Sequence, residues 1–146
     1  RVFEWLDGSW EQLGDSINGE VAEDQSGWSV SLSADGMRLA VGAPGRDATV
    51  NRPDRAGHVR VFRWSDGSWT QLGDDIEGEK VGDNSGWSVS LSADGTWLAV
   101  GAPLNGGNGD RVGHVRVFQY SDSSWKKLGD DIDGEDGRSG SSVSLS

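Results

Sequence analysis

The sequence contains no cysteine, a single methionine and no long apolar run. Without cysteine the chain has neither disulfides nor a thiol nucleophile, and its compartment stays open because secreted proteins also fold without disulfides. No stretch approaches the roughly 20 apolar residues of a membrane helix, so we expect no membrane insertion. The chain opens on Arg1, and its start therefore carries no information about targeting.

Positive charge is also scarce. Thirteen Lys and Arg residues face 24 Asp and Glu residues, giving a net charge of −11 and a pI near 4.4. A nucleic acid backbone would be repelled by such a chain, which argues against nucleic acid partners. No stretch has a sustained helical period, while 23 glycines and eight tryptophans indicate many turns and packing by a few large side chains. The composition predicts an all-β fold.

One short motif recurs along the chain. Arg-Val-Phe-x-Trp at residues 1–5 returns at 60–64 and, with tyrosine in the last position, at 116–120, so the spacings are 59 and 56 residues. A period of about 57 residues lies in the range of propeller blades, and one such unit cannot bury its apolar face alone. We therefore predict repeats at 1–59, 60–115 and 116–146, of which the last is incomplete.

The sequence predicts that each unit is a four-stranded antiparallel meander. The four strands are expected at 28–33, 37–42, 57–62 and 69–72 in one copy, and at 87–92, 96–101, 113–118 and 125–128 in the next. Alternating apolar residues and serines define the first strand, and Asp-Gly pairs or Asp122-Ser123 mark the tight turns. We predict that the first strand is innermost and that Trp28, Val30, Trp87 and Val89 pack between blades.

These motifs resemble a known family. Ser-Gly-Trp-Ser-Val-Ser-Leu-Ser at 26–33, Leu-Ala-Val-Gly-Ala-Pro at 39–44 and Gly-His-Val-Arg-Val-Phe at 57–62 look like the FG-GAP repeat of integrin-α-type β-propellers, and 85–118 matches equally well. The resemblance implies a propeller module of a secreted or cell-surface protein. Two departures matter. The family's Phe-Gly pair is replaced by Gly-Trp, and its calcium loop is reduced to one carboxylate, Asp35 or Asp94, which cannot supply the six to eight oxygens that calcium needs.

The units do not add up to a closed ring. The predicted strands number eleven, whereas propellers close with about four to eight four-stranded blades. Either the sequence is a piece of a longer chain, which we favour, or several copies assemble. The expected partners are therefore the remaining blades of its own chain or copies of itself, joined through unpaired strand edges.

No constellation points to catalysis. His58 and His114 occupy equivalent positions in two copies, which favours a role in the blade over that of a catalytic base, and no serine lies on a nucleophile elbow. The segment 105–110 is similar to a calcium-binding nonapeptide, but its aspartate falls one position early, and a plain loop is the better interpretation. We predict that the protein is not an enzyme and has no required cofactor, calcium being the one candidate.

The copies differ where the second and third strands are joined. The loops at 45–56 and 104–112 differ in length and chemistry, and in a meander they lie at the same end as the connections 20–26 and 79–85. Candidate binding residues in the loops are Arg46, Asp47, Asn51, Arg52, Asp54, Arg55, Asn105, Asn108 and Asp110. Weak candidates for holding a cation are Asp24, Asp83 and Asp136, with solvated acidic turns as the plainer interpretation.

The predicted function is a non-catalytic propeller module for adhesion, binding protein or glycan through the loops on one face. The alternative is a structural repeat that assembles into an extracellular filament or wall and has no soluble ligand.

Overall fold

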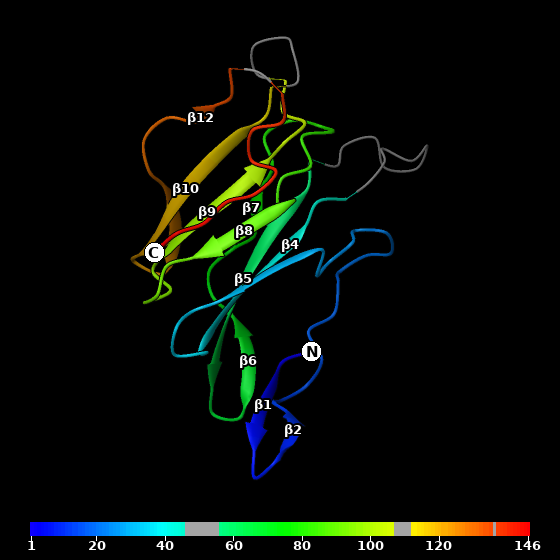
Figure 1. Cartoon of the computed structure of the whole chain (residues 1–146), viewed down its shortest axis with the longest axis vertical. Coiled ribbons are helices and arrows are strands. Elements are labelled where there is room, and N and C mark those ends of the chain that lie inside the picture. The colour runs from blue at the N-terminus through cyan, green and yellow to red at the C-terminus, as the bar shows by residue number, and fades with distance from the viewer. Residues whose placement is uncertain (46–55, 107–111, 136) are drawn as a thin grey trace.

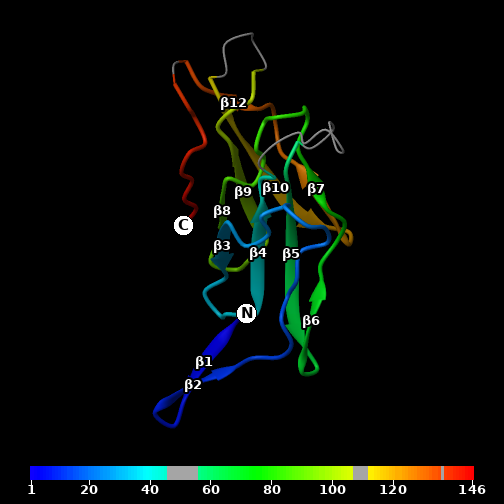
Figure 2. The ribbon, with the colours of Figure 1, turned by 90° about the vertical axis from the view of Figure 1, so that its right-hand side faces the viewer.

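The structure is a computed structural model that describes residues 1–45, 56–106, 112–135 and 137–146. Within these ranges the regular structure consists only of β-strands, arranged in three antiparallel sheets (Figures 1 and 2). The described residues include no helix long and apolar enough to cross a membrane. The prediction of an all-β chain of propeller blades is confirmed.

An N-terminal hairpin precedes two blades. The hairpin pairs β1 (Phe3–Leu6) with β2 (Ser9–Gln12). The first blade contains β3 (Ser29–Leu32), β4 (Arg38–Ala43), β5 (His58–Ser65), β6 (Ser68–Gln71) and β7 (Ile76–Glu77). The second blade contains β8 (Ser88–Leu91), β9 (Trp97–Ala102), β10 (His114–Ser121), β11 (Ser124–Lys127) and β12 (Ile132–Asp133).

The meander order is confirmed, but the predicted number of strands was wrong. Neighbouring strands follow the chain as β3-β4-β5-β6 and β8-β9-β10-β11. The outer strand is split in each blade, because β6 pairs with Phe62–Ser65 whereas β7 pairs with His58 and Val59. The expected last strand, 142–146, instead meets the second blade through a hydrogen bond of 2.9 Å from the Leu145 amide to Ser90 Oγ. The described chain thus has twelve strands in place of eleven.

The tight hairpin turns follow the sequence prediction. At Asp66-Gly67 both residues adopt positive φ, 52° and 78°, and Asp122-Ser123 does the same at 50° and 65°. Two consecutive positive φ angles are the mark of the primed turns that match the twist of paired strands. The β5–β6 and β10–β11 hairpins are therefore closed as the Asp-Gly and Asp-Ser pairs indicate.

The two blades stack face to face through unlike surfaces. The second blade presents large apolar residues, among them Val89, Leu91 and Leu98, all at most 8% exposed. Opposite them the first blade presents the smaller Ala40, Val59 and Val61, which belong to the same buried cluster, together with the serines of β3. Burial of this apolar surface, at about 25 cal/mol per Å², is the main force that holds the blades together.

Backbone contact between consecutive units requires glycine at one position in each unit. A Cβ on Gly42 would lie 2.1 Å from the carbonyl oxygen of Gly86, and a Cβ on Gly101 would lie 2.0 Å from that of Gly140. The hydroxyl groups of Ser29 and Ser88 donate to the same two carbonyls, each at 2.8 Å. The glycine of each Gly-Ala-Pro motif therefore makes room for the start of the next unit.

The outer edges of the units are joined by tryptophan. Trp69 Nε1 donates to the Leu13 carbonyl at 3.0 Å, and Trp125 Nε1 donates to the Leu72 carbonyl at 2.8 Å. Each of these indoles also packs across its hairpin, Trp69 on Trp64 and Trp125 on Tyr120. The recurrent Trp-x-x-Leu strand thus connects each unit with the one before it.

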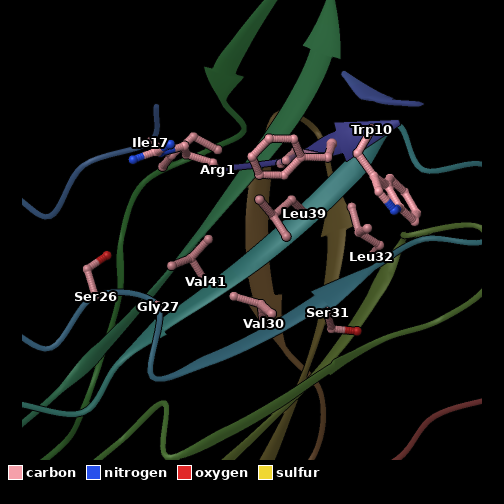
Figure 3. Close-up of a pocket in the computed structure, with 12 residues that line it drawn as sticks. Arg1, Trp10, Ile17, Ser26, Gly27, Val30, Ser31, Leu32, Leu39 and Val41 are labelled. Carbon is pink, nitrogen blue, oxygen red and sulfur yellow. The ribbon is translucent and has the colours of Figure 1, made fainter. Parts of the chain in front are cut away.

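The predicted burial of the first strand is confirmed for one blade only. Val89 is buried and Trp87 is half-buried, but Val30 is 61% exposed, so the expectation for Val30 was wrong; Trp28 is 45% exposed. Trp28 still packs on Trp87, with ring centroids 4.8 Å apart. Val30 points away from the second blade, toward the side where the β1–β2 hairpin and Ile17 lie (Figure 3).

Leu32 and Leu91 occupy equivalent positions and test the interface as a matched pair. Leu91 is 5% exposed and Leu32 is 49% exposed. We expect Leu91→Ala to lower the free energy of unfolding by about 2–5 kcal/mol, because it leaves a cavity between the blades. Leu32→Ala should lower the free energy of unfolding by much less, because Leu32 is already half exposed. Chemical denaturation of the dilute monomer measures both, and equal losses would contradict the interface.

Candidate functional site

Loops from different parts of the chain meet at one end of the blades. We call the connections 20–26 and 79–85, with the described margins of the two variable loops, the loop end. The Gly45 amide donates to the Asp24 carbonyl at 3.1 Å, and the Leu104 amide donates to the Asp83 carbonyl at 3.3 Å. The β5–β6 hairpin turn lies at the opposite end of the first blade (Figure 1). The predicted meeting of variable loop and connection is present in both blades.

Two buried aspartates organise the loop end. The carboxylate of Asp24 accepts the amides of Glu20 at 3.0 Å and Ser26 at 2.8 Å. Asp83 accepts the Lys80 amide at 2.8 Å and the side-chain amide of Asn105 at 2.7 Å. Carboxylates that accept backbone amides hold a turn in shape. The structure thus gives these two weak cation candidates a structural role.

The remaining candidate residues divide into two groups. Asn105 is 3% exposed and its amide is used on Asp83, so it orders its loop and is not open to a ligand. The other candidates lie outside the described residues: Arg46, Asp47, Asn51, Arg52, Asp54, Arg55, Asn108, Asp110 and the cation candidate Asp136.

Sequence reasoning missed a pair of buried arginines. Arg60 and Arg116, the first residues of the Arg-Val-Phe motif, are each 6% exposed. Arg60 donates to the Asn18 carbonyl at 2.7 Å, and Arg116 donates to the Glu77 carbonyl at 2.8 Å. Both guanidinium groups also lie over the phenylalanine two residues along the strand. The recurrence of arginine inside an apolar strand was the available signal.

Each blade also gathers a histidine and two carboxylates. The sets are Glu20, His58 and Asp75 in the first blade and Glu79, His114 and Asp131 in the second, with one ligand atom per residue lying within 4.8 Å of the others. The histidine begins the third strand, the glutamate comes from the connection, and the aspartate directly precedes β7 or β12. Imidazole nitrogen and carboxylate oxygen are donors that divalent metal ions use.

A lysine, Lys127, places a positive charge beside the two carboxylates of the second set. Lys127 bonds Asp131 and lies 3.9 Å from Glu79, and the hydrogen bond with Asp131 raises the pKa of Lys127. Burial alone would raise the pKa of Asp131, but the hydrogen bond from Lys127 and the charge of His114 bring it below its usual value. Burial lowers the pKa of His114, whose Nδ1 lies 3.4 Å from Asp131. The carboxylates of this set therefore have an ammonium group, that of Lys127, beside them.

The reduced calcium loops serve the turns between the first two strands. Asp35 accepts from Ser33 Oγ at 2.5 Å and from the Met37 amide at 2.9 Å. Asp94 accepts equally from Ser92 Oγ at 2.6 Å and from the Thr96 amide at 2.9 Å. The Ser-Ala-Asp-Gly sequence thus closes a turn through its own side chains.

An apolar groove lies on the outer face of the first blade. It has a volume of about 830 Å³, and residues of β3, β4 and the N-terminal hairpin line it, including Val30, Leu32, Leu39, Phe3 and Trp10 (Figure 3). The side chains of Val30, Leu32 and Trp10 are 61%, 49% and 67% exposed. The equivalent face of the second blade is the one that the first blade covers.

The comparison with protein families agrees with this geometry. Residues 78–118, which run from the second connection through β8 and β9 into β10, match the family described as FG-GAP repeat. This stretch is therefore an FG-GAP repeat, and the resemblance seen in the motifs is confirmed there. FG-GAP repeats typically occur in extracellular or cell-surface proteins. No curated protein matches the sequence.

The turn aspartates predict a defined response to acid. The hydrogen bond from Ser92 is the largest cause that lowers the pKa of Asp94 to about 2. Because the usual value is about 3.9, the stabilisation is complete above that pH and is lost as the pH falls through the folded value. We expect an NMR titration to place the pKa of Asp94 near 2.

The hydroxyl group can be removed to test the cause. Ser92→Ala should raise the pKa of Asp94 toward its usual value and leave Asp35 unchanged, while Ser33→Ala should affect Asp35 alone. An unaltered Asp94 in the Ser92→Ala variant would show that the hydroxyl is not responsible.

Proposed function

We propose that this chain is a non-catalytic propeller module that works outside the cell in adhesion, binding a protein or glycan partner at the loop end. The observation that carries the proposal is the contrast between the strands, which are nearly identical in the two blades, and the variable loops, which differ. The residues at the margins of these loops are held by hydrogen bonds to the connections. Asp24 holds Gly45, and Asp83 holds Leu104 and Asn105. Loops on a rigid scaffold are where proteins carry recognition. The usual setting of FG-GAP repeats supports the extracellular location.

The first test replaces the variable loops and keeps the residues that hydrogen-bond to Asp24 and Asp83. Residues 46–55 and 107–111 are exchanged for Gly-Ser segments, while Gly45 and Asn105 stay. We expect the melting temperature to change little, because loop length contributes only weakly to stability, and binding to a cell-surface or glycan array to be lost.

A control variant alters the other end of the blades. Exchanging the turn Asp66-Gly67 for Asn-Gly preserves the required backbone shape and should leave binding intact. Binding that survives the loop exchange would refute the proposal.

A second candidate function is assembly as a structural repeat, and the apolar groove favours it. On the second blade the matching face is covered by the side of the first blade that carries Ser29 and Ser31. The second blade carries the same chemistry, Ser88 and Ser90, on its far side, where the chain's own Gly140 and Leu145 bond these two serines. If the C-terminal segment moves off that side, the groove of a second copy can take its place, and such head-to-tail contact generates a ring or a filament.

Charge placed in the groove distinguishes assembly from binding at the loop end. Val30 is 61% exposed and lines the groove, and Val81 is 52% exposed and lies outside it. If the chain assembles, Val30→Glu should abolish oligomers in sedimentation experiments at micromolar concentration, whereas Val81→Glu should not. A wild-type chain that stays monomeric would exclude assembly.

A further inference from the structure

We propose that Glu20, His58 and Asp75 form a binding site for a divalent transition metal ion of the zinc class. The three side chains come from three separate segments, the connection 20–26, the start of β5 and the residue before β7. Their ligand atoms lie within 4.8 Å of one another. The site differs from the turn between the first two strands, where the reduced calcium loop lies, and it stands independently of the proposed function.

The second blade shows what such a set of residues requires. There the equivalent carboxylates, Asp131 and Glu79, share a positive charge, the ammonium group of Lys127. The first blade has Gln71 at that position, and its neutral Nε2 donates to Asp75 Oδ1 at 2.7 Å. Arginine approaches the glutamate in both blades, at 3.6 Å from Arg60 and 3.9 Å from Arg116, so it does not account for the difference.

The first blade therefore keeps the same ligands but lacks the lysine. Two carboxylates that face each other across a few ångströms repel unless a cation lies between them. One blade supplies that cation covalently, as a side chain. We infer that the other takes it from solution.

The space around the first set suits an ion with bound water. A cavity of about 250 Å³ opens between these residues, and Asp24 and Glu77 also line it. Asp24 already accepts two amide hydrogen bonds, and the ligand atoms that lie together are those of Glu20, His58 and Asp75, so these three are the direct ligands. Three protein ligands and one water complete the four-coordinate geometry that zinc adopts.

The histidine selects the class of metal. Imidazole favours zinc and its neighbours, whereas calcium and magnesium take oxygen ligands only. Among the described residues His58 Nε2 is buried and has no hydrogen-bond partner, so the fold does not use both nitrogens of this ring. Zinc–ligand distances of about 2.0–2.2 Å require the three side chains to move slightly together when the ion binds.

The test exchanges the residue that differs between the blades. Zinc is titrated into the full chain, without an affinity tag, by calorimetry, and metal content is measured after dialysis. We expect one zinc per wild-type chain. Gln71→Lys, which copies the second blade, should weaken binding by about tenfold or more because it places a positive charge beside the site. Lys127→Gln, which copies the first blade, should add a second zinc.

Controls separate this site from nonspecific binding. Lys126→Gln removes an exposed lysine that bonds Asp122, away from both sets, and should leave one zinc bound. His58→Ala should lose the zinc, with circular dichroism confirming that each variant is folded. The proposal is overturned if the folded wild type binds no zinc, if His58→Ala or Gln71→Lys binds it unchanged, or if calcium displaces it at equal concentration.

Discussion

The architecture depends on how closely one unit can approach the next. At the end of β4 the backbone passes so near Gly86 that a Cβ on Gly42 would lie 2.1 Å from its carbonyl oxygen, and the same contact recurs between Gly101 and Gly140. Only glycine permits this approach. Once the backbones are in contact, the serine hydroxyls reach the same carbonyls and the large residues of the second blade close over the small residues of the first. The Gly-Ala-Pro and Ser-Gly motifs are thus two halves of one contact between units.

This stacking also explains why the two faces of a blade differ. Alternation along a strand sends serines to one side and valine and leucine to the other, and the serine side of one unit meets the apolar side of the following unit. An interface built from unlike faces propagates in one direction. The apolar side of the first blade faces the N-terminal hairpin, which covers only part of it and leaves the groove. The same side of the second blade is buried, because the first blade covers it.

The repeats share a scaffold, but a few substitutions give each blade its own chemistry. The exchange of Gln71 for Lys127 is the clearest case, because the surrounding histidine, aspartate and glutamate are otherwise the same. The loop end shows the same principle on a larger scale. There the fastening aspartates Asp24 and Asp83 are common to both blades, whereas the loops fastened to them differ. A stable repeat can therefore vary its loops and single polar residues without altering its packing.

The sequence alone determined the strand order, the tight turns and the end of the blades at which the loops meet, because alternation, Asp-Gly pairs and the repeat period are local signals. It did not reveal that Val30 is exposed while Val89 is buried, since the two occupy identical motifs and differ only in what lies across the sheet. Nor did it show that the outer strand is split, or that His58 lies beside Glu20 and Asp75, which are separated from it along the chain. Only the tertiary structure decided these points, because burial and ligand sets depend on which segments the fold brings together.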